Sequence, residues 1–144
     1  MPFQIHTGMA AMNRTNAMEI RPVIERHPDT TFVLMHGSYP WTADMTGLIH
    51  YYRNVVADIC YLPLLSPSVA HRVLHELIEV GNADKICWGC DTWTSEESYG
   101  SLLAIRGILL RVLSEKVADG YMDVDAAARY ASGILFHNAA KIFK

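Results

Sequence analysis

Cysteine and long hydrophobic runs are scarce in this sequence of 144 residues. Only three cysteines occur, Cys60, Cys87 and Cys90, which is an odd number and too few for a fold stapled by disulfides. No apolar run reaches the roughly 18–20 residues that a membrane-spanning helix needs. The first residues also lack the basic segment and apolar stretch of a secretory signal peptide. These absences predict a cytoplasmic protein that does not enter a membrane.

A strong excess of charge is also missing. The formal net charge is -3, which argues against a surface that binds nucleic acid or acidic lipid. Hydrophobic residues make up 51% of the chain and charged residues 19%, a composition that excludes a disordered protein. We therefore expect one folded domain over residues 1–144.

The chain alternates between short β-prone segments and helical segments. Expected strands cover residues 3–7, 31–35, 54–60 and 85–89, and expected helices cover residues 16–27, 41–53, 68–80, 95–118, 123–132 and 134–143. Gly81-Asn82 is expected to close the third helix. Strands separated by helices predict parallel βαβ units. Four such units form either an open, doubly wound α/β sheet or half of an eight-stranded barrel.

Each expected strand ends in, or is closely followed by, a residue suited to metal binding or acid–base chemistry. These residues are His6, His36, Asp58 and Asp91. In parallel α/β folds the functional groups lie at the carboxyl ends of the strands, so we expect all four at one edge of the sheet. Imidazole and carboxylate groups bind zinc and related divalent ions, and a bound ion activates water as a nucleophile.

Four segments at these strand ends carry a family pattern: residues 2–8 (PFQIHTG), 33–40 (VLMHGSYP), 54–58 (NVVAD) and 88–91 (WGCD). With the C-terminal stretch 138–143 (NAAKIF) they resemble the amidohydrolase superfamily, in particular its amidohydrolase-related TIM-barrel metal-dependent hydrolases. The resemblance implies that the chain is the C-terminal half of such a barrel, strands five to eight, followed by C-terminal helices.

The resemblance also implies roles for individual residues. His6 matches a metal ligand, and His36 matches a second metal ligand or a residue that polarises the substrate or water. Asp91 matches the aspartate that binds metal and moves the proton of the attacking water. Asp58 falls where the family has no shared catalytic role. The expected cofactor is a divalent metal, Zn²⁺, and the expected partner is a small-molecule substrate.

One part of the family pattern is missing, because the His-x-His pair of the first barrel strand occurs nowhere in the sequence. Two functions therefore stay open. The chain is a metal-dependent hydrolase whose site another chain or an N-terminal half completes, or it is an inactive half-barrel that serves as an oligomeric structural domain. Either way, a lone four-stranded half exposes sheet edges and apolar surface, which predicts a homodimer or larger homo-oligomer.

Two further motifs have ordinary explanations. Cys87 and Cys90 form a C-x-x-C motif that could support disulfide redox chemistry, but we expect it along a strand, where residues three apart point to opposite faces. His71 and His75 have the i, i+4 spacing of a two-histidine metal site. Because the zincin pattern places Glu beside the first histidine and Arg72 stands here, we expect surface or partly buried helix residues instead.

Overall fold

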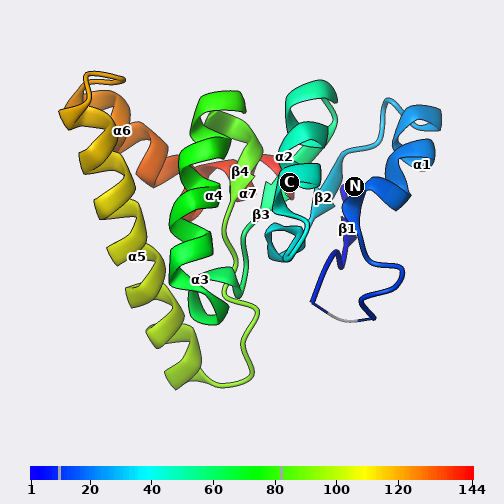
Figure 1. Cartoon of the computed structure of the whole chain (residues 1–144), viewed down its shortest axis with the longest axis horizontal. Helices are drawn as coiled ribbons and strands as arrows, with labels where there is room; N and C mark the ends of the chain where they lie inside the picture. The colour runs from blue at the N-terminus through cyan, green and yellow to red at the C-terminus, as the bar shows by residue number, and fades with distance from the viewer. Residues whose placement is uncertain (10, 82) are drawn as a thin grey trace.

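The structure, a computed structural model, describes residues 1–9, 11–81 and 83–144 and contains a four-stranded sheet (Figure 1). The strand order is β1 (Phe3–Ile5), β2 (Phe32–Leu34), β3 (Val55–Asp58) and β4 (Ile86–Cys87). Every neighbouring pair is parallel. The predicted α/β class with four parallel βα units is therefore confirmed. Because each strand lies beside the next one along the chain, all four carboxyl ends share one edge of the sheet.

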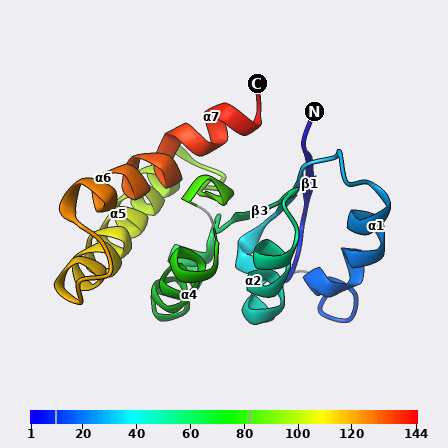
Figure 2. The same ribbon diagram turned by 90° about the horizontal axis from the view of Figure 1, so that it is seen from above.

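The helices lie on both faces of this sheet. The first face carries α1 (Arg21–Arg26), α2 (Thr42–Tyr51) and α4 (Pro67–Val80), with the long α5 (Ser95–Ala118) next to α4. In Figure 2 the C-terminal α7 (Asn138–Ile142) crosses the opposite side of the sheet, after α6 (Val124–Ser132). Among the helices that the structure describes, none combines the length and apolar character needed to cross a membrane.

Two apolar clusters divide between the two faces of the strands. Phe32, Leu34 and Ile86 belong to the large core that packs against the helical layer. Their sequence neighbours Val33 and Cys87 belong, with Val56, to a second cluster against which Ala139 and Ile142 of α7 pack. Burial on both faces explains why the strands read as continuous apolar runs rather than as alternating patterns.

The regular strands are shorter than the sequence predicts. Strand β2 ends before His36, whose φ of 61° is a left-handed conformation that a strand cannot contain. A short 3-10 turn, His36–Ser38, follows it. Beyond β3, Tyr61 has φ of 58° and precedes α3 (Leu62–Leu65), a short helix inside a predicted loop.

The helical predictions differ in smaller ways. Helix α5 covers the predicted residues 95–118. The predicted helix over residues 16–27 is a 3-10 turn, Ala17–Ile20, that leads into α1. The last predicted helix begins as a π-helix, Gly133–His137, before α7. Helix α4 ends at Val80 with Gly81 as its cap. Asn82 of the predicted closing pair lies outside the described residues.

Candidate metal centre at the strand ends

The carboxyl edge of the sheet brings three of the predicted residues together. His6 follows β1 and His36 follows β2, and their ring centroids lie 4.2 Å apart at an interplanar angle of 53°. Asp91 lies beyond β4, with its Oδ2 3.6 Å from His36 Nδ1. His36 therefore stands between a second imidazole and a carboxylate.

The loop that presents His36 is held in an uncommon backbone conformation. His36, Gly37 and Ser38 have φ values of 61°, 56° and 52°. Such left-handed residues concentrate at functional sites, where the surrounding structure must hold them. A Cβ at Gly37 would lie 2.7 Å from Leu62 Cδ2, so α3 packs directly against this loop.

The loop after β1 is fixed to the His36 loop by close contacts. Thr7 Oγ1 donates a hydrogen bond to Met35 O at 2.7 Å. Gly8 has φ of 67°, and a Cβ there would lie 2.1 Å from Tyr39 O. Only glycine permits both this conformation and this approach. These contacts set the position of His6 relative to His36.

The environment of His36 keeps its imidazole neutral. Its side chain is buried, and burial together with the neighbouring His6 lowers the pKa of His36 below 6.5, against the opposing influence of Asp91. Its Nε2 is buried and has no hydrogen-bond partner among the residues that the structure describes. A proton on Nδ1 would face the Asp91 carboxylate and leave the Nε2 lone pair free. A buried neutral imidazole with an unused nitrogen is a group able to ligate a metal or bind a substrate.

Cys60 is a neighbour of His36 that the sequence interpretation missed. Its Sγ lies 3.4 Å from His36 Nδ1, and His36, Cys60 and Asp91 form a cluster able to hold a metal ion. Burial raises the pKa of the Cys60 thiol, so the sulfur stays protonated in the absence of a metal. The only signal in the sequence is its position two residues after Asp58, where β3 ends.

Asp58 lies beneath this cluster and organises the sheet edge. Its Oδ1 accepts hydrogen bonds from the backbone N–H groups of Cys60 at 2.9 Å and Gly89 at 3.1 Å. It thereby ties the chain after β3 to the chain after β4. Burial raises the pKa of its carboxyl. These contacts give Asp58 a structural role at the sheet edge.

Asp91 is the exposed member of the cluster. It has φ of 50°, and its side chain is 48% accessible. The chain then enters α5, whose N-cap Thr94 accepts a hydrogen bond from Glu97 N. Asp91 is thus an accessible carboxylate carried by a short loop between β4 and a long, well-anchored helix.

The C-x-x-C motif does not lie along one strand, which corrects the prediction. Strand β4 ends at Cys87, and Cys90 belongs to the following loop. Cys87 is buried, and its burial raises the pKa of its thiol to about 12. Cys90 is partly exposed, and its contact with Thr92 lowers the pKa of its thiol. All three cysteines are free thiols, and a thiol as basic as Cys87 is poorly suited to disulfide exchange at neutral pH.

Comparison with known proteins agrees with this arrangement. The family model for amidohydrolases matches residues 1–144. The chain belongs to the amidohydrolase family. It is 28% identical over 149 residues to protein fluG of Emericella nidulans. It also superposes, with a TM-score of 0.87 and 25% identity, on a crystal structure of a protein from Lactobacillus casei, provisionally assigned as a metal-dependent hydrolase.

This amidohydrolase chain is much shorter than both relatives. The matches cover 99% of this chain in each case, but only 17% of fluG and 39% of the Lactobacillus casei chain. The resemblance inferred from the strand-end segments is therefore confirmed over the whole sequence. The individual roles of His6, His36 and Asp91 stay predictions.

Proposed function

We propose that this chain contributes the strand-end part of a metal-dependent hydrolase site that acts on a small-molecule substrate. The observation that carries the proposal is His36, a buried neutral imidazole with an unused Nε2, placed between the His6 ring and the Asp91 carboxylate. Two imidazoles and a carboxylate are a donor set that suits Zn²⁺. In this proposal His6 and Asp91 hold the ion, and His36 is either a third ligand or the residue that polarises the group under attack.

The residues themselves have distinct tasks in the proposed reaction. A divalent ion bound at this site would supply a water whose pKa is lowered to about 7. Asp91, exposed beside His36, takes the proton of the attacking water, and His36 polarises the group under attack. Family membership and the Lactobacillus casei structure support hydrolysis in general terms. The proposed reaction is the cleavage of a C–N, C–O or C–C bond, including decarboxylation.

Completion of the site is part of the same proposal. Zinc in hydrolases is held by three protein ligands and an open position, or by more ligands in two-metal sites. The relatives are longer than this chain, and a second polypeptide segment would supply the remaining wall of the site. We propose that a second copy of the chain does so, in a cytoplasmic homodimer or larger homo-oligomer.

Exposed apolar surface supports association. Strands β1 and β4 are the edges of the described sheet. Helices α5 and α6 flank a groove of about 830 Å³, beside which Leu110 is 70% and Val124 69% exposed. Contiguous apolar surface of this kind marks an interaction site.

Size-exclusion chromatography with light scattering tests this association. L110K should shift the oligomer towards the monomer, whereas R129A, an exposed change on α6, should not. A wild-type monomer at all concentrations would contradict the proposed association.

The alternative function is an inactive half-barrel that serves only as an oligomeric structural domain. The observation that favours it is the absence of the family's His-x-His metal-binding pair from the sequence. An inactive domain would show no turnover of amides, esters or carboxylates. Turnover abolished by D91N would eliminate this alternative.

Metal content is the decisive measurement for the proposed function. Elemental analysis of protein purified without chelators should find one equivalent of metal per chain more in the wild type than in H6A or D91N. The matched control is H27A, since His27 is an exposed residue at the end of α1. Full metal retention by both strand-end variants would show that these residues do not form the site.

A further inference from the structure

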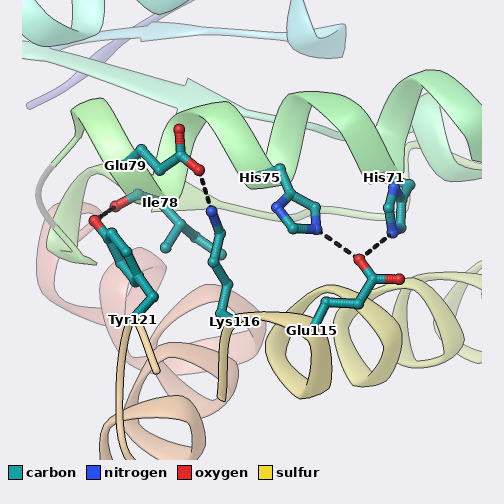
Figure 3. A network of polar contacts seen from close by, with 7 residues as sticks. All are labelled: His71, His75, Ile78, Glu79, Glu115, Lys116 and Tyr121. Atoms are coloured by element: carbon teal, nitrogen blue, oxygen red, sulfur yellow. Dashed lines mark hydrogen bonds and ion pairs between the residues drawn. The ribbon is translucent and has the colours of Figure 1, made fainter. Parts of the chain in front are cut away.

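A second group of metal-ligating side chains lies in the helical layer, between α4 and α5. His71 and His75 extend from α4 towards Glu115 of α5 (Figure 3). Their Nε2 atoms lie 2.8 Å and 2.6 Å from the same atom, Glu115 Oε2. Two imidazoles thus converge on one carboxylate oxygen across a helix–helix contact.

The helices hold these residues in place through their buried faces. The i, i+4 spacing places both histidines on one side of α4, while Ala70, Val73, Leu74, Leu77 and Ile78 anchor that helix in the core. On α5, Val112, Leu113 and Lys116 are buried around Glu115. The two histidines are partly buried, as the sequence predicts. The convergence with Glu115 therefore comes from rigid elements.

Other charged residues of α4 and α5 are paired with one another, so the Glu115 carboxylate is available to bind a cation. Lys116 pairs with Glu79 and also lies 4.8 Å from the centre of the Tyr121 ring. Arg72 of α4 pairs with Glu76 and also donates to Thr42 of α2. Among the residues that the structure describes, the ion-pair partners of Glu115 are His71 and His75 alone. Its contact with His75 lowers the pKa of the Glu115 carboxyl, which keeps it ionised at neutral pH.

The dimensions fit a small divalent ion after a minor adjustment. Ligand atoms of a tetrahedral zinc site with bonds of about 2.0–2.1 Å lie ~3.4 Å apart. One ligand atom from each of the three side chains lies within 4.8 Å of the others. The shorter contacts to Oε2 must open by less than about 1 Å to admit the ion. Side-chain exposures of 27%, 25% and 42% leave a path from solvent and room for a water ligand.

We propose that His71, His75 and Glu115 form a divalent metal site that binds Zn²⁺ and clamps α4 to α5. The two histidines provide neutral imidazole nitrogens and Glu115 provides one carboxylate oxygen, with solvent in the remaining position. The site is separate from the one at the strand ends. It shares no residue with that cluster and does not depend on any catalytic activity.

Zinc binding to the full chain tests this assignment. Competition against a chromogenic chelator should detect one Zn²⁺ equivalent that H75Q loses. E115Q should lower the zinc affinity of this site at least tenfold, because removing even an outer-shell partner of a metal ligand has an effect of about that size. The matched control is E76Q, a carboxylate on the same helix that pairs with Arg72, which should bind zinc like the wild type. Zinc should also raise the Tm of the wild type but not of H75Q.

A second background separates the two metal sites. The double variant H6A/D91N removes the two exposed side chains proposed to hold metal at the strand ends and should keep the α4–α5 equivalent with unchanged affinity. Cu²⁺ added to that variant should show nitrogen hyperfine coupling from two imidazoles by electron paramagnetic resonance, and from one in the added H75Q background. Equal zinc affinity and stoichiometry in wild type and H75Q would overturn the assignment. So would a double variant that binds no zinc.

Discussion

The side chain of Asn138 holds the C-terminal helix against the sheet, and its removal should be measurable. Asn138 is buried at the start of α7. Its Nδ2 donates to Ala83 O at 2.7 Å and to Ile86 O at 2.8 Å. A Cβ at Gly133 would lie only 3.2 Å from the Asn138 amide, so the chain makes room for this side chain. The amide thus links the π-helix and α7 to the beginning of β4.

N138D is the sharpest perturbation of this contact. It preserves shape, but the ionised carboxylate has no donor and turns an oxygen towards two carbonyl oxygens. Each buried carbonyl that loses its hydrogen-bond partner lowers the free energy of unfolding by about 1–3 kcal/mol. For the two carbonyls together we expect a decrease of about 3 kcal/mol. At about 2–4 °C per kcal/mol for a chain of this size, the Tm should fall by roughly 6–12 °C.

The variant should also acquire a pH dependence that the wild type lacks at this position. Burial beside two carbonyls raises the pKa of the new carboxyl above the ordinary Asp value of about 3.9. The unfolded chain then releases its proton at lower pH than the folded chain does. Stability is therefore lost as the pH rises above about 4. Urea unfolding should show a smaller penalty at pH 4.5 than at pH 8, because a protonated carboxyl restores one donor.

Asn54 provides the matched control. Its Nδ2 also donates to two carbonyls, those of His27 at 3.1 Å and Thr30 at 3.0 Å, but the side chain is only partly buried. Water can replace the lost donor there, so N54D should cost less than half as much as N138D. Equal penalties for the two variants, or a penalty for N138D that is the same at pH 4.5 and pH 8, would refute the reasoning.

Four other predictions concern the site and its surroundings. Iodoacetamide at pH 7.5 should label Cys90 first and the two buried cysteines only on unfolding, as peptide mapping would show, because burial raises the pKa of both buried thiols. G8A should bind less metal, and its free energy of unfolding in urea should be lower by at least ~2 kcal/mol, since the new Cβ would overlap Tyr39 O. G100A, in the open interior of α5, should instead raise stability by about 0.5–1 kcal/mol in the same assay. Because the pKa of His36 is lowered in the folded chain, the unfolded chain binds a proton at a higher pH than the folded chain does, from about 6.5 downward. The free energy of unfolding measured with urea should therefore decrease below that pH, and it should decrease less steeply in H36Q.

The strand-end cluster could be predicted because its cause is topological. Parallel strands joined in chain order place their carboxyl ends at one edge, so histidines and aspartates at or shortly beyond the strand ends are candidate members of the cluster without any knowledge of side-chain contacts. His6, His36 and Asp91 are reached in this way. Cys60 also lies near a strand end, but in the sequence it reads as one more apolar residue of a buried strand. Its place beside His36 involves the hydrogen bond that its backbone N–H donates to Asp58. A side-chain hydrogen bond of this kind has no periodic signature in the sequence.

The strand lengths and the short helices were less predictable for a related reason. Apolar periodicity marks where a strand is buried, but its end is set by backbone conformation. Regular pairing stops at Leu34 and Asp58, two and three residues before the left-handed residues His36 and Tyr61. A left-handed conformation at a residue other than glycine is uncommon and is not evident from the sequence. The π-helix before α7 was equally hidden, since its apolar residues read as an ordinary continuation of a helix.

The α4–α5 cluster shows where the limit of sequence reasoning lies. The spacing of His71 and His75 is local and visible, and it predicts that both side chains share a helix face. Their partner Glu115 is 44 and 40 residues away, at a position fixed only when α5 packs along α4. Three other charged residues of α4 and α5, Lys116, Glu79 and Arg72, have other partners, so the pattern of charges along the two helices does not by itself identify Glu115. The tertiary contact, and not the histidine spacing, is what turns an ordinary helix face into a candidate metal site.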